Sequence, residues 1–413
     1  MSTKLPFKRA IAAIGGSAGM ALTSLVLALC LMQQASVEAY GLFAFLLITQ
    51  ALANGFSNAM LGSPLLIALS ELEGSDNDDA KAKVHSFMLA NVLLCLVFAV
   101  IQASIVYSFT KAPWLSSIYA FSAFITTLRW FGRSYCNNSH QHSKVVISDA
   151  CYSALSLVGA CALFFTQNVS LESFGILTAA AALLATPLLG SRYLKPQFTS
   201  AFRAGFKGFR EGWNKQGKHA LVGVLTTEGT LNSHSYMVTF FFGPAAFAPI
   251  AAAGLLFRPV MVVLTSLSQI ERPRIRQLLS NGLVTEAKFS LFRYRLVNVG
   301  FWSLNCIGAA IVLIFFVDFY WKDSQSVHAL LWATMLYALI RGSRSLSSTY
   351  NVFLQAADQF KALSFVTLKT SLLTIPLVFI SMRLFEPSFS LVGILIGELM
   401  AFYLLTRLYR GVK

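Results

Sequence analysis

The sequence predicts an all-α, polytopic membrane protein with about twelve transmembrane helices. Its 413 residues are 56% hydrophobic and only 12% charged, with a mean hydropathy of +0.65. Soluble domains average about 25% charged residues, so this composition is typical of a chain that lies largely in lipid. Apolar runs of about 20 residues can cross a hydrocarbon core of about 30 Å. They predict helices at residues 10–33, 41–69, 84–109, 114–133, 145–166, 173–191, 219–242, 246–270, 296–318, 326–344, 362–382 and 390–407.

The basic residues predict the side of the membrane on which each connection lies. The formal charge of +15 comes from lysines and arginines that gather in alternate connections between the apolar runs. This distribution follows the positive-inside rule, and it argues against a nucleic-acid partner. The rule places both termini in the cytoplasm of a bacterial cell, with the helices in the inner membrane. The opposite connections are all short, so no extracytoplasmic domain is expected. The first run is longer than the roughly 7–15 apolar residues of a cleaved signal peptide, and is predicted to be a retained helix.

A basic connection divides the chain into two parts. Residues 192–218 contain seven basic residues, one acid, and phenylalanines at positions 198, 202, 206 and 209. The spacing predicts an amphipathic helix on the anionic inner leaflet, with a solvated linker as the alternative. An N-terminal six-helix lobe (1–191) precedes it, and a C-terminal six-helix lobe (219–413) follows. Weak similarity between FITTLRWFGRSY (124–135) and MLYALIRGSRSL (335–346) indicates that the lobes are pseudo-repeats.

The apolar hairpin at residues 221–270 contains two ionisable residues in its membrane-spanning part. At 1.5 Å per residue, Glu228 and Arg258 lie about 14 Å and 18 Å from the inner face, close to the midplane. Ionised groups at this depth are costly and often mark a transport pathway. The alternative is an ion pair that only holds the two helices together. Pro259 and Pro249 each remove a backbone hydrogen bond, so we expect hinges there.

Paired arginines occur on two further predicted helices. Arg129 and Arg133 share one helix face, as do Arg341 and Arg344. We expect a cationic entrance for a phosphorylated head group, because guanidinium groups match phosphate oxygens. Snorkelling to lipid head groups is the alternative.

Further polar and charged residues lie within the predicted membrane helices. Gln50 and Asn54 belong to a polar stripe that must face a cavity or another helix. Glu398 lies near mid-depth and needs a partner, whereas Lys369 can snorkel. His234 is expected to be a hydrogen-bonded core residue, and Asp149 to need no special role.

No catalytic or metal-binding motif is present. The six cysteines have no metal-ligand spacing, and no HExxH, GxSxG or Walker A sequence occurs. The sequence therefore predicts a protein that is not an enzyme, with no metal and no cofactor. Coupling of its activity to H⁺ or Na⁺ stays open.

Several segments resemble a polysaccharide flippase of the multidrug/oligosaccharidyl-lipid/polysaccharide (MOP) exporter superfamily. They are GGSAGMALTSLVLAL, QASVEAYGLFAFLL, RWFGRSYCNNSHQHSKVVISDACYSALSL and FGPAAFAPIAAAGLLFRPVMVVLTSLSQIERPRI. The resemblance implies two six-helix lobes around a central cationic cavity that opens alternately to each side. It implies a lipid-linked oligosaccharide substrate carried on undecaprenyl pyrophosphate. By position, Arg258 is the best match to the family's head-group arginines, followed by Arg129 and Arg341.

The resemblance also implies partners: membrane lipids, and the polysaccharide polymerase or export machinery. Two other classes of function are weighed against it. A cation-coupled drug antiporter of the same superfamily often uses carboxylates in its first lobe, and the first three predicted helices have none in their apolar parts. A membrane glycosyltransferase or polymerase is expected to have a large extracytoplasmic loop, and none of these connections is long enough.

Overall fold

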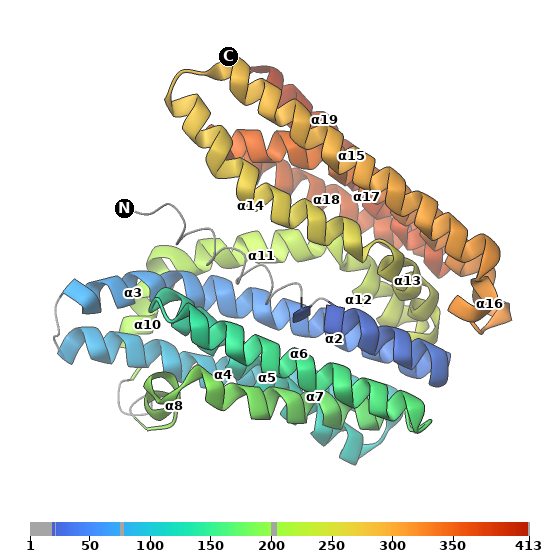
Figure 1. Ribbon diagram of the computed structural model, residues 1–413, viewed down its shortest axis with the longest axis horizontal. Coiled ribbons are helices and arrows are strands. Elements are labelled where there is room, and N and C mark those ends of the chain that lie inside the picture. The colour runs from blue at the N-terminus through green and yellow to red at the C-terminus, as the bar shows by residue number, and fades with distance from the viewer. Residues whose placement is uncertain (1–18, 21, 75–77, 200–204, 412–413) are drawn as a thin grey trace. The chain divides into compact units, whose positions relative to one another are not determined.

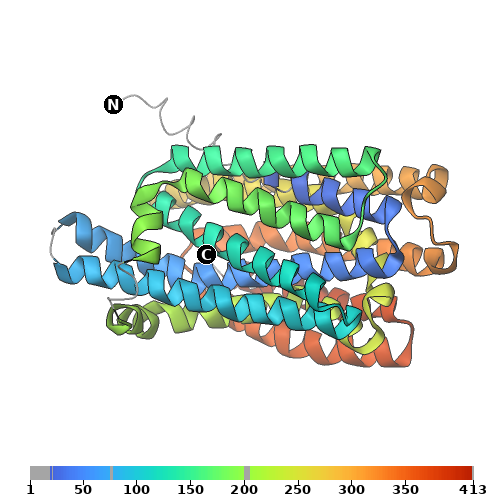
Figure 2. The ribbon, with the colours of Figure 1, turned by 90° about the horizontal axis from the view of Figure 1, so that it is seen from below.

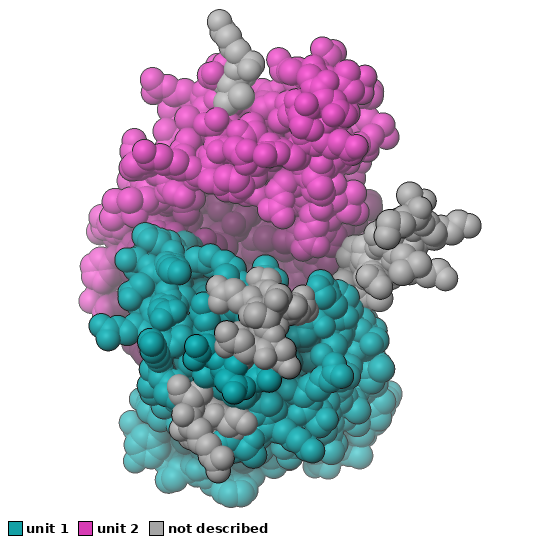
Figure 3. Space-filling model, turned by 90° about the vertical axis from the view of Figure 1, so that its left-hand side faces the viewer, with its two compact units in different colours: residues 1–225 teal, residues 226–413 magenta. Residues whose placement is uncertain are grey.

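The computed structural model describes residues 19–20, 22–74, 78–199 and 205–411 (Figure 1). Within these ranges all regular structure is helical and no strand occurs, as the sequence predicts. The chain divides into two compact units, Met1–Leu225 and Thr226–Lys413, which Figure 3 colours separately. The division falls within one helix, α11 (Lys218–Leu231).

Unit 1 is a bundle of long helices. Its described elements are the helix Leu22–Gln34; α2 (Val37–Ser57), a π-helical turn (Asn58–Gly62) and α3 (Ser63–Gly74); α4 (Asp78–Thr110); α5 (Pro113–Asn138); α6 (His142–Phe165); α7 (Leu171–Ala185) with a 3₁₀ turn (Thr186–Leu189); α8 (Ser191–Phe198); α10 (Lys207–Gly212); and a second π-helical turn (Trp213–Gly217). Figures 1 and 2 show α4 to α7 side by side, with α5 packed against α4 and α7. Tyr193 of α8 donates to the Leu128 carbonyl, and a Cβ at Gly132 would overlap its ring.

Unit 2 contains the C-terminal part of α11, from Thr226, and the helices that follow it. They are α12 (Ser233–Phe242), α13 (Pro244–Leu256), α14 (Arg258–Ser280), α15 (Val284–Phe315), α16 (Val317–Tyr320), a 3₁₀ turn (Ser324–Ser326), α17 (Val327–Ala356), α18 (Phe360–Leu384), a second 3₁₀ turn (Pro387–Phe389) and α19 (Ser390–Gly411). Helix α17 packs against α13, α14, α15 and α19, and α18 packs closely against α19.

All twelve predicted segments are largely helical where the structure describes them, with short breaks inside some of them, as at Asn232 and Phe257. Among the described residues, seven helices are long and apolar enough to span a membrane, or eight when the bent pair α13 and α14 counts as one span. The other predicted spans are too short or too polar to pass the same test. The helix Leu22–Gln34 has 13 residues, α11 and α12 are separate short helices, and α5 and α17 are long but less apolar.

Three helices run well past their apolar segments. Helix α14 continues to Ser280, α15 begins at Val284, and α17 continues to Ala356. These extensions pack together through a separate apolar cluster that includes Ile275, Leu291 and Phe353. The apolar run predicts only the part of a helix that contacts lipid. These three helices continue beyond that part because their extensions pack against one another.

The basic connection differs from the single amphipathic helix that the sequence predicts. Its described part consists of α8, α10 and a π-helical turn, and Phe202 lies outside the described residues. Phe209 packs against the apolar cluster that includes Phe87 of α4, while Phe198 and Phe206 are exposed. The phenylalanine spacing is therefore divided between contacts with helices of unit 1 and exposed surface.

The close packing of α18 and α19 depends on Gly393. A Cβ there would overlap the backbone of Leu377 and Val378. We expect Gly393→Ala to lower the melting temperature of the detergent-solubilised protein, with a loss of about 1–3 kcal/mol from overpacking. The matched control is Gly308→Ala, because Gly308 lies on a lipid-length helix with open space around it. Equal melting temperatures for the two variants would contradict this account.

Candidate functional site

A buried charge cluster in unit 1 engages the first arginine pair. Asp149 of α6 accepts from Arg129 Nη2 through one oxygen, and from Arg133 Nε and Nη2 (3.1 and 2.8 Å) through the other. The Arg129 side chain is 3% exposed and that of Asp149 is 2% exposed. Arg129 also donates to Ser148 (3.1 Å), which in turn donates to the Ala185 carbonyl. The cluster therefore joins α5, α6 and α7.

Aromatic rings cover both guanidinium groups of this cluster. Arg129 lies 4.6 Å from the centroid of the Tyr152 ring, and Arg133 lies 4.4 Å from that of Trp130. Cation–π contacts and the shared carboxylate thus satisfy both cations within the bundle. The expectation that Asp149 has no special role is wrong. Arg133 lies five residues before the end of α5 and Asp149 seven residues after the start of α6, so the short turn between them could have revealed the pairing.

The polar stripe on α2 faces neighbouring helices. Gln50 donates to Thr127 of α5 (3.1 Å) and to Asn54 (3.3 Å), and it accepts from Gln102 of α4 (3.3 Å). One turn further, Asn58 accepts from Trp130 (3.1 Å). The sequence allows this stripe to face a cavity or another helix, and Gln50 contacts two other helices, α4 and α5.

The hairpin residues Glu228 and Arg258 lie on α11 and at the start of α14. Glu228 accepts from Asn232 Nδ2 (2.8 Å) and from the Tyr236 hydroxyl (3.4 Å). These described partners belong to its own side of the hairpin, so the ion pair with Arg258 that the sequence left open is not among them. Arg258 is half-buried and begins α14 directly after the break at Phe257.

Backbone breaks occur in both arms of the hairpin. Asn232 separates α11 from α12, and α13 and α14 meet at Phe257 with a bend of 51°. Pro259 lies in the first turn of α14, so its missing N–H explains why the helix does not continue through this point. Pro249 lies inside α13, which continues past it without interruption.

Arg341 belongs to a buried network in unit 2. Its Nη1 lies 3.1 Å from the sulfur of Met261, and its guanidinium lies 5.5 Å from the centroid of the Tyr337 ring. The Tyr337 hydroxyl bonds with His234 Nε2 (3.0 Å). His234 is buried, as the sequence predicts for a hydrogen-bonded core histidine.

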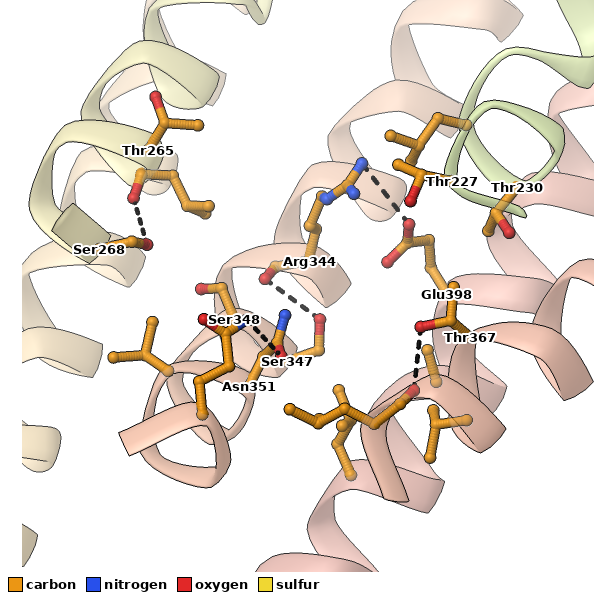
Figure 4. Close-up of a pocket in the computed structure, with 18 of the residues that line it drawn as sticks. Thr227, Thr230, Thr265, Ser268, Arg344, Ser347, Ser348, Asn351, Thr367 and Glu398 are labelled. Carbon is orange, nitrogen blue, oxygen red and sulfur yellow. Dashed lines mark hydrogen bonds and ion pairs between the residues drawn. The ribbon is translucent and has the colours of Figure 1, made fainter. Parts of the chain in front are cut away.

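Arg344, three residues further along α17, lines a cavity of about 500 Å³ within unit 2 (Figure 4). Five helices contribute to it: α11, α14, α17, α18 and α19. Hydroxyl and amide side chains make up much of the lining, as Figure 4 shows for Thr227, Thr230, Thr265, Ser268, Ser347, Ser348, Asn351 and Thr367. The cavity is thus suited to a ligand with many hydrogen-bonding groups.

One loose ion pair lies in the wall of this cavity. Arg344 Nη1 and Glu398 Oε1 are 3.7 Å apart, which is longer than a hydrogen bond. The same Nη1 is buried, and no hydrogen-bond partner for it is found among the described residues. Arg272, which also lines the cavity, donates to Gln355 (3.0 Å). Arg344 therefore retains donor capacity that a ligand oxygen could use.

Two residues of this cavity show what sequence reasoning could and could not identify. Glu398 was expected to need a partner, and the structure supplies Arg344. Arg272 was not among the predicted site residues, because its position in a basic connection makes it resemble an ordinary cytoplasmic cation. No group of three or more potential metal ligands occurs among the described residues.

Comparison with solved structures identifies the fold as that of MOP-superfamily transporters. An inward-facing multidrug resistance MATE-family transporter of that superfamily superposes with a TM-score of 0.73 at 12% identity, over 94% of this chain and 93% of its own. The lipid II flippase MurJ, in an inward closed conformation, gives a TM-score of 0.73 at 13% identity, over 98% and 87%. A MOP transporter from Pyrococcus furiosus gives 0.58 at 13% identity, over 97% and 94%. No protein-family model and no curated protein sequence matches the chain.

The likeness therefore places the chain in a class of fold, that of polytopic membrane proteins built as MOP transporters are. The sequence-based fold class is confirmed by these neighbours. Both multidrug resistance transporters and a lipid flippase occur among them, so the substrate must be argued from the chemistry of this chain's own cavity.

The Arg129–Asp149–Arg133 cluster generates a test of structural against ligand-binding roles. Asp149→Asn leaves two buried guanidinium groups short of a counter-charge, so we expect a loss of about 3–5 kcal/mol in stability. The measurement is the melting temperature, taken as the temperature at which heated, detergent-solubilised protein loses half of its monodisperse peak in size-exclusion chromatography. Adding Arg129→Met to Asp149→Asn removes one of the two excess charges, and we expect it to restore part of the loss. An unchanged melting temperature in Asp149→Asn would contradict a structural role.

Proposed function

We propose that the chain is a flippase that moves a lipid-linked oligosaccharide, carried on undecaprenyl pyrophosphate, across the bacterial cytoplasmic membrane by alternating access. The observation that carries this proposal is the cavity of about 500 Å³ in unit 2, with its hydroxyl and amide lining and its incompletely bonded arginine. The product would feed the synthesis of exopolysaccharide, O-antigen or capsule. Both termini would lie in the cytoplasm.

The lining of the cavity suits a sugar. Serine, threonine, asparagine and glutamine side chains can donate and accept, as can each sugar hydroxyl. A buried hydroxyl left without a partner costs about 1–3 kcal/mol, so a polar lining favours a polyhydroxylated ligand over an apolar one. The cavity volume of about 500 Å³ lies within the range of about 300–1,000 Å³ that is typical of small-molecule sites.

The cations of the cavity suit a phosphate. Arg344 has spare donors beside Glu398, and Arg272 lines the same cavity. Guanidinium groups bind phosphate oxygens through paired hydrogen bonds, which makes arginine suitable for a pyrophosphate head group. Arg258, half-buried at the bend between α13 and α14, is a further candidate along the same pathway.

A cation-coupled drug antiporter is the alternative, and one observation favours it. Glu398 places a carboxylate in the cavity wall, where a cationic drug, H⁺ or Na⁺ could bind. Asp149, held by two arginines, is a poor site for a further cation, and Glu228 already accepts two hydrogen bonds. Glu398 is held only loosely, so it stays available to a cation. The hydroxyl and amide lining and the unused donor of Arg344 favour the flippase.

Substitution of Arg344 tests the flippase. We expect Arg344→Gln to lower export at least about tenfold, because a lost charge-assisted hydrogen bond costs about 1.5–3 kcal/mol. The measurement is lipid-linked oligosaccharide that accumulates in a deletion strain complemented with each variant. Lys288→Gln is the matched control, since Lys288 is exposed on α15 and lines no described pocket.

Three outcomes would contradict the flippase. Arg344→Gln could export as well as the wild type, or the deletion strain could accumulate no lipid-linked oligosaccharide. The deletion strain could instead become sensitive to cationic dyes, while proteoliposomes containing the protein extrude those dyes along an ion gradient. This last result would establish the antiporter.

The bend at Phe257 generates a second test of transport. Pro259→Ala restores an N–H group that could continue the helix, so we expect a straighter, more stable protein that exports more slowly. The measurements are the melting temperature and the accumulation of lipid-linked oligosaccharide in the same strain. Pro273→Ala, inside α14 and exposed, is the control and should leave export unchanged. A hinge at Pro259 is refuted if its variant exports normally while its melting temperature rises.

A further inference from the structure

A second, separate recess lies between the first turns of α18 and the last turns of α19. It is an open groove of about 550 Å³, and Gln359 and Gly411 are among the residues that line it. Its apolar wall includes Phe365, Leu404 and Leu408. Both helices are long and apolar enough to span a membrane, so a groove on their exposed surface is open to lipid.

Among the described residues that line this groove, two are cations and none is a carboxylate. Lys369 of α18 and Arg407 of α19 both point an exposed side chain at it. Neither side chain has an ion pair or hydrogen bond among the described residues, whereas Arg344 and Arg276, also in unit 2, both pair with carboxylates. The groove therefore has a net positive charge of two beside apolar walls.

The two cations lie close enough to one end of the helix pair for their side chains to extend toward lipid phosphates. Lys369 lies nine residues after the start of α18, and Arg407 four residues before the end of α19, so at 1.5 Å per residue they lie about 14 Å and 6 Å from that end of the helix pair. A lysine side chain extends toward the head-group region while its stem stays in the apolar layer. Both cations can then reach one phosphate near the membrane surface.

We propose that this groove binds an anionic glycerophospholipid, with its phosphate held between Lys369 and Arg407. One acyl chain would lie against Phe365 and Leu404. Basic pockets between transmembrane helices on the cytoplasmic side are suited to such head groups, and the positive-inside rule predicts the same side for this end of α18 and α19. The site does not depend on the proposed transport function.

The lipid site borders the cavity of unit 2. Val366 lines both, while Thr367 and Thr370 face the cavity, and Phe365 and Lys369 face the groove. Helix α18 therefore presents one face to each. A lipid bound in the groove would therefore stabilise α18, which forms part of the cavity wall.

The test uses the purified full-length chain in detergent, with dioleoyl phosphatidylglycerol as the anionic lipid and dioleoyl phosphatidylcholine as the neutral one. Native mass spectrometry should show one phosphatidylglycerol that survives activation, and that lipid should raise the melting temperature more than phosphatidylcholine does. The double variant Lys369→Gln/Arg407→Gln should weaken this binding by roughly tenfold or more. The matched control is Lys361→Gln/Arg410→Gln, which removes equal charge from the same helices outside the groove and should bind as the wild type does.

Any of three results would overturn the proposal. The first is equal loss of binding in both double variants, which would indicate attraction by general surface charge. The second is equal stabilisation of the wild type by the two lipids. Stabilisation by inorganic phosphate alone, to the same extent as by phosphatidylglycerol, would also refute a lipid site, because the apolar wall would then contribute nothing.

Discussion

The constraint on which this structure depends is that a charge inside a bilayer must have a partner. An ionised side chain at mid-depth costs several kcal/mol unless it is paired or reaches water. The described residues meet the constraint in different ways. Asp149 is shared by two arginines, Glu398 pairs with Arg344, and Glu228 accepts hydrogen bonds from an amide and a hydroxyl. These ion pairs join helices within each unit, α5 with α6 in unit 1 and α17 with α19 in unit 2.

Helix α17 shows how one element can serve packing and a site together. Residues three apart lie about 60° apart around a helix, so Arg341 and Arg344 face different neighbours although they share one broad face. Arg341 reaches Met261 and Tyr337 within the packed interior, while Arg344 reaches the cavity. Met261 also lines that cavity, so the packed network forms part of its support.

The helices were predictable from the sequence, and most of the pairings were not. Long apolar runs indicate helices that contact lipid, which is why every predicted segment is largely helical where described. To predict which charged residues pair, one must know the rotation of each helix about its axis and which helices are its neighbours. The hydropathy of the sequence gives neither. Arg133 and Asp149 are an exception, because a short turn fixes their relative depth. Arg344 and Glu398 are 54 residues apart in the chain, and only the packing of α17 on α19 joins them.

The geometry of the two arginine–carboxylate groups separates a structural role from a binding role. Asp149 accepts three charge-assisted hydrogen bonds, the shorter of the two from Arg133 being 2.8 Å, and rings cover both guanidinium groups. Opening this cluster for a substrate would forfeit all of those contacts. Arg344 and Glu398 stand 3.7 Å apart, beside a cavity, with a donor unused. In the flippase proposed above, an arriving phosphate would exchange places with this weakly held carboxylate at small cost, because little hydrogen bonding is lost when the pair separates. A flippase must bind and then release its cargo, and a loosely paired arginine suits both steps better than one whose hydrogen bonds are all made.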